Sequence, residues 1–386
     1  MIIMNVMLSG GGTGGHIYPA LAVAEALRQQ YPNSTLIYVG NADGMEHTLA
    51  EEAGYRFIPM SVAGFKKRGI WQTLLVLYKN WRGLAQAKAL LRQFRPDLVI
   101  GTGGYACGPL LLEATRLHIP TLLHEQNAIM GKTNKILSRH VNKICLTFPI
   151  ADLSAAVAAK TVLTGLPVRQ AILQTEPAAA RKRLGLALDK PVLLLTGGSQ
   201  GARHLNQALA ELWQELLTAG VQIVHITGEK LFLETAAMAQ KQGLPVTTEN
   251  AGDNSAEYMP RAQNGFLLLP YLHHMEYAMA AADLVVGRAG ASFLAEVMAL
   301  GRAAVLVPYP FAAGNHQVYN ARSMVQAGAA LQIDDDALSA QSLRAALQKA
   351  LFDIKLRDRM AANSAALGKR DAAANIIKTA AALAGL

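Results

Sequence analysis

Short apolar runs alternate with amphipathic segments along most of the chain. The run at residues 2–8 is long enough for a buried strand, and Leu21, Ala24 and Leu27 after it have helical spacing. This alternation predicts an α/β fold with doubly wound parallel sheets. Further strands are expected at residues 35–39, 98–100, 121–124, 143–146, 192–195, 222–226, 265–269, 284–286 and 304–307.

A glycine-rich loop, "SGGGTGGH" from Ser9 to His16, joins the first expected strand to the first expected helix. We expect Pro19 in the first turn of that helix, where its missing N–H is not needed. A helix N-terminus presents unpaired N–H groups and a partial positive charge, and glycine lets the backbone approach an anion closely. The pattern predicts a phosphate-binding loop, with a tight turn that binds nothing as the alternative.

The sequence also contains an internal duplication. "LSGGGTGGH" at Leu8 recurs loosely as "LTGGSQGAR" at Leu195, and "DLVIGTGGY" at Asp97 recurs as "DLVVGRAGA" at Asp283. Two tandem Rossmann-like units are therefore expected, facing one cleft, with ligands at the carboxyl ends of their strands. We place them at residues 1–168 and 169–370, followed by a helix at 371–386 that packs back on the first unit.

The net charge and the cysteine content indicate which partners and which cellular compartment to expect. The formal net charge of +9 favours an anionic partner, such as a nucleic acid, a membrane surface or phosphate groups. Two cysteines, Cys107 and Cys145, are too few for a disulfide framework and suit a reducing compartment. Residues 1–24 carry no charge, but their glycines, Asn5 and Pro19 argue against a membrane span. A soluble or peripheral cytoplasmic protein is expected.

Two further motifs give weaker signals. Gly10, Gly12 and Gly15 fit the G-x-G-x-x-G pattern, but the acidic residue of a dinucleotide site is misplaced because Asp43 comes late. Three aspartates at residues 334–336 resemble a metal-binding motif. They precede a helical pattern, so helix capping is the preferred interpretation.

Seven motifs taken together resemble one family. In order along the chain stand "GGTGGH", "GTGGYACGP", "HEQNAIMGKTNK", "GLPVR", "TGGSQGAR", "GRAGASFLAE" and "NHQVYNA". They resemble the MurG family of peptidoglycan N-acetylglucosaminyltransferases over essentially the whole chain. The resemblance implies the GT-B fold and inverting transfer of N-acetylglucosamine from UDP-GlcNAc to the C4 hydroxyl of MurNAc in lipid I. The products are lipid II and UDP, and no metal or other cofactor is implied.

The resemblance assigns the donor chiefly to the second unit. It implies Ser199 beside the donor pyrophosphate, Arg169 against the charge of departing UDP, and Glu296 on the ribose. For Glu296 the alternative is an ordinary surface helix glutamate. Leu272 and Met275 match the uracil-facing segment. The remaining implied donor contacts are Thr13, Gly14, Gly15, Asn127, Ala291, His316, Gln317 and Asn320.

The first unit is expected to hold the acceptor. Backbone N–H groups bind phosphates well, and the resemblance places Gly14, Gly15, Gly103, Gly104 and Tyr105 at the lipid pyrophosphate. Inversion needs a base for the attacking hydroxyl, and His16 is the first candidate because histidine titrates near neutral pH. Glu125 is the rival base. The alternative for His16 is a residue that only hydrogen-bonds the backbone at the helix start.

The segment "GFKKRGIWQTLLVLYKNWRG" at residues 64–83 is both basic and apolar. The residues that suggest a membrane contact are Lys66, Lys67, Arg68, Trp71, Leu75, Tyr78 and Trp81. A core-facing helix is the ordinary interpretation of such a stripe. The basic triplet, the aromatic residues and a lipid-linked acceptor favour peripheral binding to the anionic inner leaflet. The expected location is the cytoplasmic face of the cell membrane, with cell-wall or division machinery as partners and no nucleic acid.

Three other functions stay open at this point. Another GT-B glycolipid glycosyltransferase would use a different acceptor. A nucleotide-sugar epimerase of similar fold would have no lipid acceptor. A non-enzymatic module would bind the nucleotide sugar at a membrane without turnover.

Overall fold

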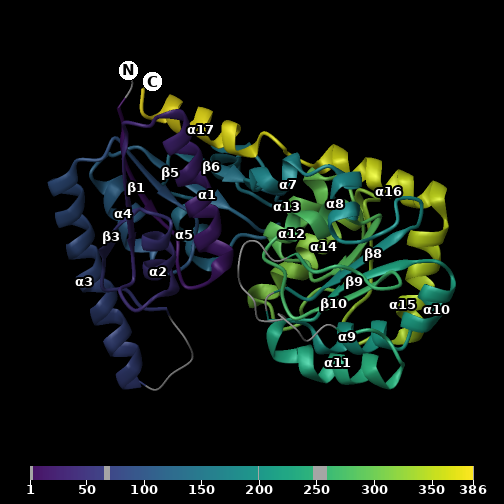
Figure 1. Cartoon of the computed structure of the whole chain (residues 1–386). Coiled ribbons are helices and arrows are strands. Elements are labelled where there is room, and N and C mark those ends of the chain that lie inside the picture. The colour runs from purple at the N-terminus through teal and green to yellow at the C-terminus, as the bar shows by residue number, and fades with distance from the viewer. Residues whose placement is uncertain (1–2, 65–69, 199, 247–258, 386) are drawn as a thin grey trace. The chain divides into compact units, whose positions relative to one another are not determined.

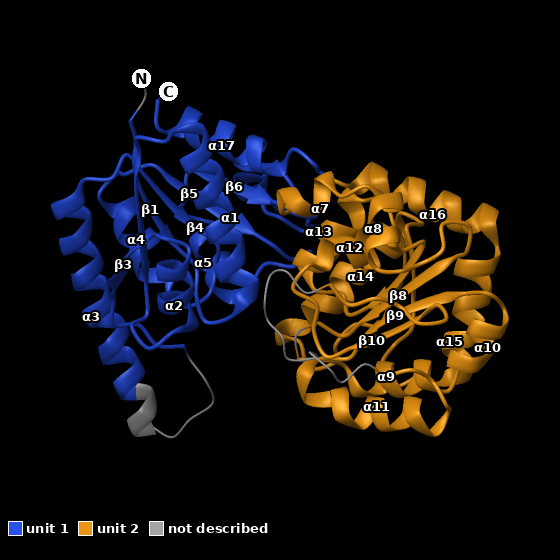
Figure 2. Cartoon of the chain, viewed as in Figure 1, with its two compact units in different colours: residues 1–167, 369–386 blue, residues 168–368 orange. Residues whose placement is uncertain are grey.

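The chain forms two compact units, unit 1 (Met1–Pro167 and Lys369–Leu386) and unit 2 (Val168–Gly368) (Figure 2). The computed structural model describes residues 3–64, 70–198, 200–246 and 259–385, and for residues 70–73 the backbone alone. Each unit is built on one fully parallel sheet with helices packed against it (Figure 1). The expected α/β fold class with two doubly wound units is confirmed.

Unit 1 contains a seven-stranded sheet with the order β3-β2-β1-β4-β5-β6-β7. Its strands are β1 (Asn5–Ser9), β2 (Thr35–Gly40), β3 (Arg56–Pro59), β4 (Leu98–Gly101), β5 (Thr121–Glu125), β6 (Lys143–Leu146) and β7 (Thr161–Leu163). The inner strands are continuous buried runs, as expected for a parallel sheet covered on both faces. The sequence pattern misses the edge strands β3 and β7, which are short and partly exposed and so lack such a run.

The helices of unit 1 are α1 (Gly14–Gln30), α2 (Met45–Glu52), α3 (Ile70–Phe94), α4 (Cys107–Arg116), α5 (Lys132–Leu137), α6 (Ala155–Ala158) and α17 (Ala372–Leu383). Because α1 begins at Gly14, Pro19 lies inside it and not in its first turn, which corrects the expectation. The C-terminal helix α17 packs against α1 (Figure 1). Its Ile376 and Ile377 join the buried cluster that contains Val23 of α1.

Unit 2 contains a six-stranded sheet with the order β10-β9-β8-β11-β12-β13. Its strands are β8 (Val192–Thr196), β9 (Gln222–Ile226), β10 (Phe266–Leu269), β11 (Leu284–Gly287), β12 (Ala303–Leu306) and β13 (Ala330–Gln332). Its α-helices are α7 (Gln170–Gln174), α8 (Pro177–Arg183), α9 (Arg203–Ala210), α10 (Trp213–Thr218), α11 (Phe232–Lys241), α12 (Met275–Ala281), α13 (Ala291–Ala299), α14 (His316–Gln326), α15 (Ala340–Leu347) and α16 (Ile354–Leu367).

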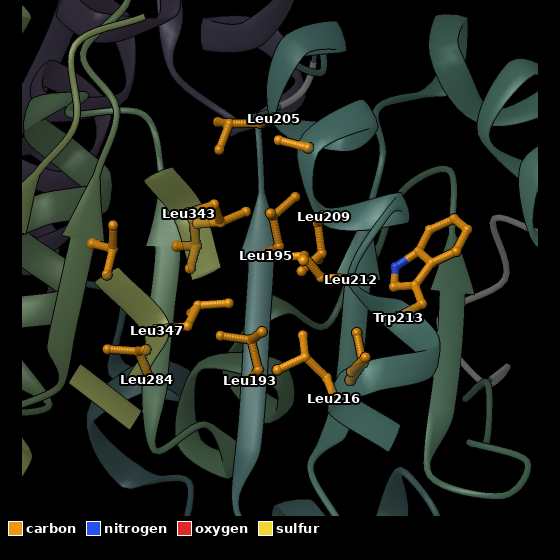
Figure 3. Close-up of a cluster of buried hydrophobic side chains, with 14 of the residues drawn as sticks. Leu193, Leu195, Leu205, Leu209, Leu212, Trp213, Leu216, Leu284, Leu343 and Leu347 are labelled. Atoms are coloured by element: carbon orange, nitrogen blue, oxygen red, sulfur yellow. The ribbon is translucent and has the colours of Figure 1, made fainter. Parts of the chain in front are cut away.

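A buried cluster of unit 2 packs on one face of β8. Leu193 and Leu195 of β8 are fully buried, and Leu209 of α9 packs in the same cluster (Figure 3). Leu343 of α15 and Trp213 of α10 belong to it as well. This cluster fixes the sheet beneath the loops that follow β8 and β11.

The central strands of the two sheets have the same order, and the register of the pair β1–β4 matches that of the pair β8–β11. Leu8 of β1 pairs with Ile100 of β4, and its sequence counterpart Leu195 of β8 pairs with Val286 of β11. In each sheet the strand order reverses between these two neighbouring strands, which is where ligands of such sheets bind. The duplicated glycine-rich loops therefore stand at equivalent ligand-binding positions of the two units.

Candidate functional site

The glycine-rich loop of unit 1 leads from β1 directly into α1. Thr13 is the N-cap of α1 and makes no side-chain capping bond, so the first-turn N–H groups of Gly14 and Gly15 have no acceptor in the helix. These N–H groups and the positive end of the helix dipole suit an anion. The site thus has the geometry that the phosphate-binding prediction requires.

Two buried side chains, Tyr38 and Glu46, form hydrogen bonds with the backbone of this loop. The sequence pattern predicted neither contact. The Tyr38 hydroxyl donates to Gly10 O at 2.5 Å. Burial raises the pKa of Tyr38, so the hydroxyl stays protonated and remains a donor. The carboxylate of Glu46, at the start of α2, accepts from Gly12 N at 3.3 Å. The loop is therefore preformed by contacts to β2 and α2.

A second glycine loop, after β4, lies directly against the first. Gly11 N donates to Gly103 O at 3.3 Å. Gly104 has a φ of +79°, and a Cβ there would lie 1.9 Å from Gly11 O, so no side chain fits between the loops. The ring of Tyr105 packs beside Gly12. The structure thus brings together the residues predicted for the acceptor pyrophosphate.

His16 lies on the first turn of α1, between these loops. Its Nδ1 is 3.1 Å from Thr102 O and 3.0 Å from Gln126 Oε1. A backbone carbonyl can only accept, so Nδ1 carries a proton, and in the neutral ring Nε2 then has the lone pair. Within the described part of the chain Nε2 has no hydrogen-bond partner. The half-buried ring therefore has one nitrogen committed to the protein and one available to a ligand.

Glu125, the rival base, is buried at the end of β5 and fully engaged. One carboxylate oxygen accepts from Asn127 N at 3.0 Å and from the Asn127 side-chain amide at 3.4 Å. The other accepts from Gly131 N at 3.1 Å and from Asn134 Nδ2 at 2.8 Å. All four donors belong to the loop and helix that follow β5, so Glu125 shapes that segment.

The glycine loop of unit 2 follows β8, the counterpart of β1. Gly201 N donates to Gly198 O at 2.9 Å, which closes a tight turn, and both glycines have positive φ. A Cβ on Gly201 would lie 2.2 Å from Thr227 O, so the backbone passes too close for a side chain. Ser199, predicted at the donor pyrophosphate, lies outside the described residues.

Glu296 and Arg169 form an ion pair in unit 2. Arg169 Nη2 lies 3.4 Å from Glu296 Oε1, and the two side chains are 53% and 16% exposed. Burial raises the pKa of Glu296, although the positive charge of Arg169 acts in the opposite direction and Glu276 acts in the same direction. Glu296 is thus not an ordinary surface glutamate, and it lies beside the arginine predicted to face the leaving group.

Three of the predicted donor residues begin helices, and a fourth, Leu272, lies just before one. Met275 is the first residue of α12 and Ala291 the first of α13, while Leu272 is buried just before α12. His316 is the first residue of α14, and its Nδ1 donates to Ala313 O at 2.9 Å. The structure places these residues in unit 2 at the N-termini that follow the sheet's carboxyl ends.

Gln317 and Asn320 of α14 hold the loop that precedes α13. Gln317 Oε1 accepts from Ala289 N at 3.0 Å and from Tyr309 N at 2.9 Å. Asn320 is buried, and its Nδ2 donates to Ala289 O at 3.1 Å. Both side chains therefore position the backbone of Ala289 through contacts that the sequence did not reveal.

The expectation for the aspartates at residues 334–336 was wrong. The following helix α15 is capped by Ser339, whose side chain accepts from Ser342 N at 3.1 Å. Asp335 instead pairs with Arg288 at 2.6 Å and with His204 at 3.0 Å. Arg288, which follows β11, also donates to Val307 O, so this ion pair ties three loops of unit 2 together. The sequence pattern missed Arg288 because its partner is far away in the chain.

Helix α3 packs one face against unit 1 and leaves several large apolar side chains exposed on the rest of its surface. A Cβ on Gly83 would lie 2.4 Å from Ser61 O, which shows how closely this face approaches the unit. The buried positions are Val76, Gly83, Ala87 and Leu91. The exposed apolar face consists of Leu74, Leu75, Leu77, Tyr78 and Trp81. Lys66, Lys67 and Arg68 lie outside the described residues, as does the side chain of Trp71.

Helix α3 also exposes basic side chains, in addition to this apolar face. The helix has no acidic residue, and the exposed basic side chains are Lys79, Arg82, Lys88 and Arg92.

None of the helices that the structure describes is long and apolar enough to cross a membrane. In the same described residues there is no group of three or more His, Cys, Asp or Glu side chains that could hold a metal ion.

The two units and their loops define a glycosyltransferase of the GT-B fold. The family model for the glycosyltransferase family 28 N-terminal domain matches residues 6–146, and that for the glycosyltransferase family 28 C-terminal domain matches residues 192–376. Each model covers most of one parallel sheet.

Full-length relatives identify the family more closely. The UDP-N-acetylglucosamine--N-acetylmuramyl-(pentapeptide) pyrophosphoryl-undecaprenol N-acetylglucosamine transferase of Desulfitobacterium hafniense is 42% identical over 376 residues, 97% of this chain and 98% of that one. The transferase of the same name from Desulforudis audaxviator is 42% identical over 384 residues, 99% of each chain. The crystal structure of Acinetobacter baumannii MurG matches with a TM-score of 0.77 and 29% identity over 98% of this chain and 99% of that one. The chain belongs to the MurG family within glycosyltransferase family 28, which confirms the resemblance.

Proposed function

We propose that this chain transfers N-acetylglucosamine from UDP-GlcNAc to the C4 hydroxyl of MurNAc in lipid I, giving lipid II and UDP in peptidoglycan synthesis. The observation that carries the proposal is the 42% identity, over nearly the whole chain, to transferases named for this reaction. The equivalent anion-binding loops of the two units suit it, because both substrates carry a pyrophosphate.

His16 is the base in this proposal. Its Nε2 takes the proton of the attacking hydroxyl while the hydroxyl oxygen bonds to the anomeric carbon. The bond from that carbon to the UDP oxygen breaks on the opposite side, and the electron pair leaves with UDP, so the configuration inverts. Glu125 is less suited to this task because four donors already occupy its carboxylate.

Unit 2 binds the donor in this proposal. Glu296 accepts from the ribose hydroxyls, and Arg169, which is half-exposed beside it, neutralises charge that grows on UDP. The pyrophosphate binds where the glycine loop after β8 leads to the N-terminus of α9. Gln317 and Asn320 act through Ala289, whose backbone they fix just before α13. Since Arg169 supplies the positive charge, we propose that transfer proceeds without a metal ion.

The enzyme works at the inner face of the cell membrane in this proposal. The exposed apolar face of α3 and its exposed basic side chains suit an anionic lipid surface, which is where the lipid tail of the acceptor resides. Cell-wall and division machinery are the proposed protein partners at that surface.

The proposal is tested by incubating the purified chain with UDP-GlcNAc and a short-chain lipid I analogue. We expect a lipid-linked disaccharide and one UDP for each disaccharide formed. Transfer to another glycolipid but not to the analogue would indicate a different glycosyltransferase. Conversion of UDP-GlcNAc to an epimer without acceptor would indicate an epimerase, and binding without turnover would indicate a non-enzymatic module.

A further inference from the structure

A continuous chain of hydrogen bonds leads from His16 into the interior of unit 1. His16 Nδ1 is 3.0 Å from Gln126 Oε1, and Gln126 Nε2 is 3.0 Å from both His124 O and His124 Nδ1. His124 Nε2 is 2.9 Å from Gly165 O. His124 and Gln126 are buried at the end of β5, and neither has been given a role so far.

Backbone carbonyls at both ends determine the direction of every bond in this chain. Gly165 O can only accept, so His124 carries its proton on Nε2 and has a lone pair on Nδ1. The two hydrogens of Gln126 Nε2 then go to His124 Nδ1 and His124 O. This orients the Gln126 carbonyl oxygen toward His16, whose Nδ1 must donate to it.

The opposite orientation of the Gln126 amide would create three unfavourable contacts. A flipped amide would place its oxygen against His124 O and against the His124 Nδ1 lone pair. It would also aim a donor at His16 Nδ1, which already donates to Thr102 O at 3.1 Å. Burial lowers the pKa of His124 to about 4, so the ring is neutral at working pH and Nδ1 stays an acceptor.

We infer that Gln126 and His124 are positioning residues that reinforce Thr102 O in fixing the tautomer of His16, with the proton on Nδ1 and the lone pair on Nε2. The inference rests on the proposed function, in which His16 Nε2 takes the proton of the acceptor hydroxyl. An unconstrained neutral imidazole exchanges between two tautomers, and only the one with a bare Nε2 can act as a base there. The chain of bonds therefore keeps His16 in its reactive form before the substrate arrives.

The tautomer can be measured directly on the full-length protein. Long-range ¹H–¹⁵N correlation spectra of ¹⁵N-histidine-labelled enzyme distinguish protonated from unprotonated ring nitrogens, and comparison with His16→Asn assigns the His16 signals. At a pH where the ring is neutral, we expect a protonated Nδ1 and an unprotonated Nε2. A proton on His16 Nε2 in the wild-type enzyme would overturn the inference whatever the kinetics show.

Gln126→Leu removes the acceptor but retains the size of the side chain. One of the two acceptors for His16 Nδ1 remains, at Thr102 O, so the loss corresponds to one hydrogen bond. We expect the ratio of the Nε2-protonated to the Nδ1-protonated tautomer to rise by roughly 3- to 10-fold, with kcat lowered by the fraction of His16 lost to the Nε2-protonated form and UDP affinity unchanged. Gln86→Leu makes the same change on α3, where Gln86 Oε1 accepts from Ser61 N, and should leave the His16 spectrum and kcat as they were.

Different variants test the positioning role of Gln126 and the role of His16 as the base. An unchanged tautomer and unchanged kcat in Gln126→Leu would overturn the positioning role. A near-wild-type kcat in His16→Ala would overturn the proposed base, and the wild-type spectrum does not depend on that result. If Gln126→Leu does not fold, Gln126→Met makes the same test with a flexible side chain of similar length that offers no oxygen acceptor.

Discussion

The exposed apolar face of α3 allows a quantitative prediction for membrane binding. Leu75 is 54% exposed, and full burial of a leucine is worth about 1.5–3 kcal/mol, so its exposed half can contribute about 1 kcal/mol. Trp81 is 68% exposed. With about 200 Å² for the side chain and about 25 cal/mol per Å², it can contribute about 3 kcal/mol. Leu75→Ser combined with Trp81→Ser should therefore weaken binding to anionic vesicles by up to roughly 1,000-fold, or about 4 kcal/mol.

Sedimentation with phosphatidylglycerol vesicles measures this loss, and a water-soluble acceptor shows whether the active site survives. Activity on that acceptor should not change. The matched control combines Leu233→Ser and Phe352→Ser, which remove exposed apolar side chains from unit 2. Wild-type binding should also weaken in high salt, as exposed charges are screened. Undiminished binding by the α3 variant, or an equal loss in the control, would refute this reasoning.

Four more predictions concern the proposed base, donor binding and the metal. His16→Ala should lower kcat by roughly 10²–10⁴-fold with little change in UDP affinity, and a UDP-release assay giving a kcat within a few-fold of wild type would favour Glu125 as the base. Glu296→Ala should weaken UDP binding by about 1.5–3 kcal/mol in calorimetric titration. Because burial raises the pKa of Glu296, the wild-type affinity for UDP should fall as the pH drops through that raised value and the carboxylate is protonated, whereas Glu296→Gln should show no such fall. Chelation by EDTA should leave the transfer rate unchanged, and a loss restored by a divalent cation would contradict the metal-free proposal.

The sequence predicted the architecture well because its signals are local or repeated. Buried parallel strands are continuous apolar runs, and the repeated glycine loops identified β1 and β4 as the counterparts of β8 and β11. Edge strands such as β7 give no such signal, since one side of the strand has no neighbour and burial is incomplete. The start of α1 was misjudged because Pro19 is tolerated inside the helix.

The site was predicted less completely because its decisive contacts join distant segments. Thr102 and Gln126 meet at His16 although they follow different strands, so the protonated nitrogen of His16 could not be inferred from its neighbours in sequence. The occupied carboxylate of Glu125 likewise depends on the folding of its loop back onto β5. Asp335 shows the same limit, because its partner Arg288 lies on another loop.

The central claim is inverting transfer to lipid I, and the anomeric configuration of the product tests it most directly. ¹H NMR of the disaccharide formed from UDP-GlcNAc and a lipid I analogue reports the linkage through the coupling of the new anomeric proton. Single displacement with His16 as the base predicts the β anomer from the α-linked donor, with one UDP released for each linkage. An α linkage, or consumption of UDP-GlcNAc without a disaccharide, would contradict the account.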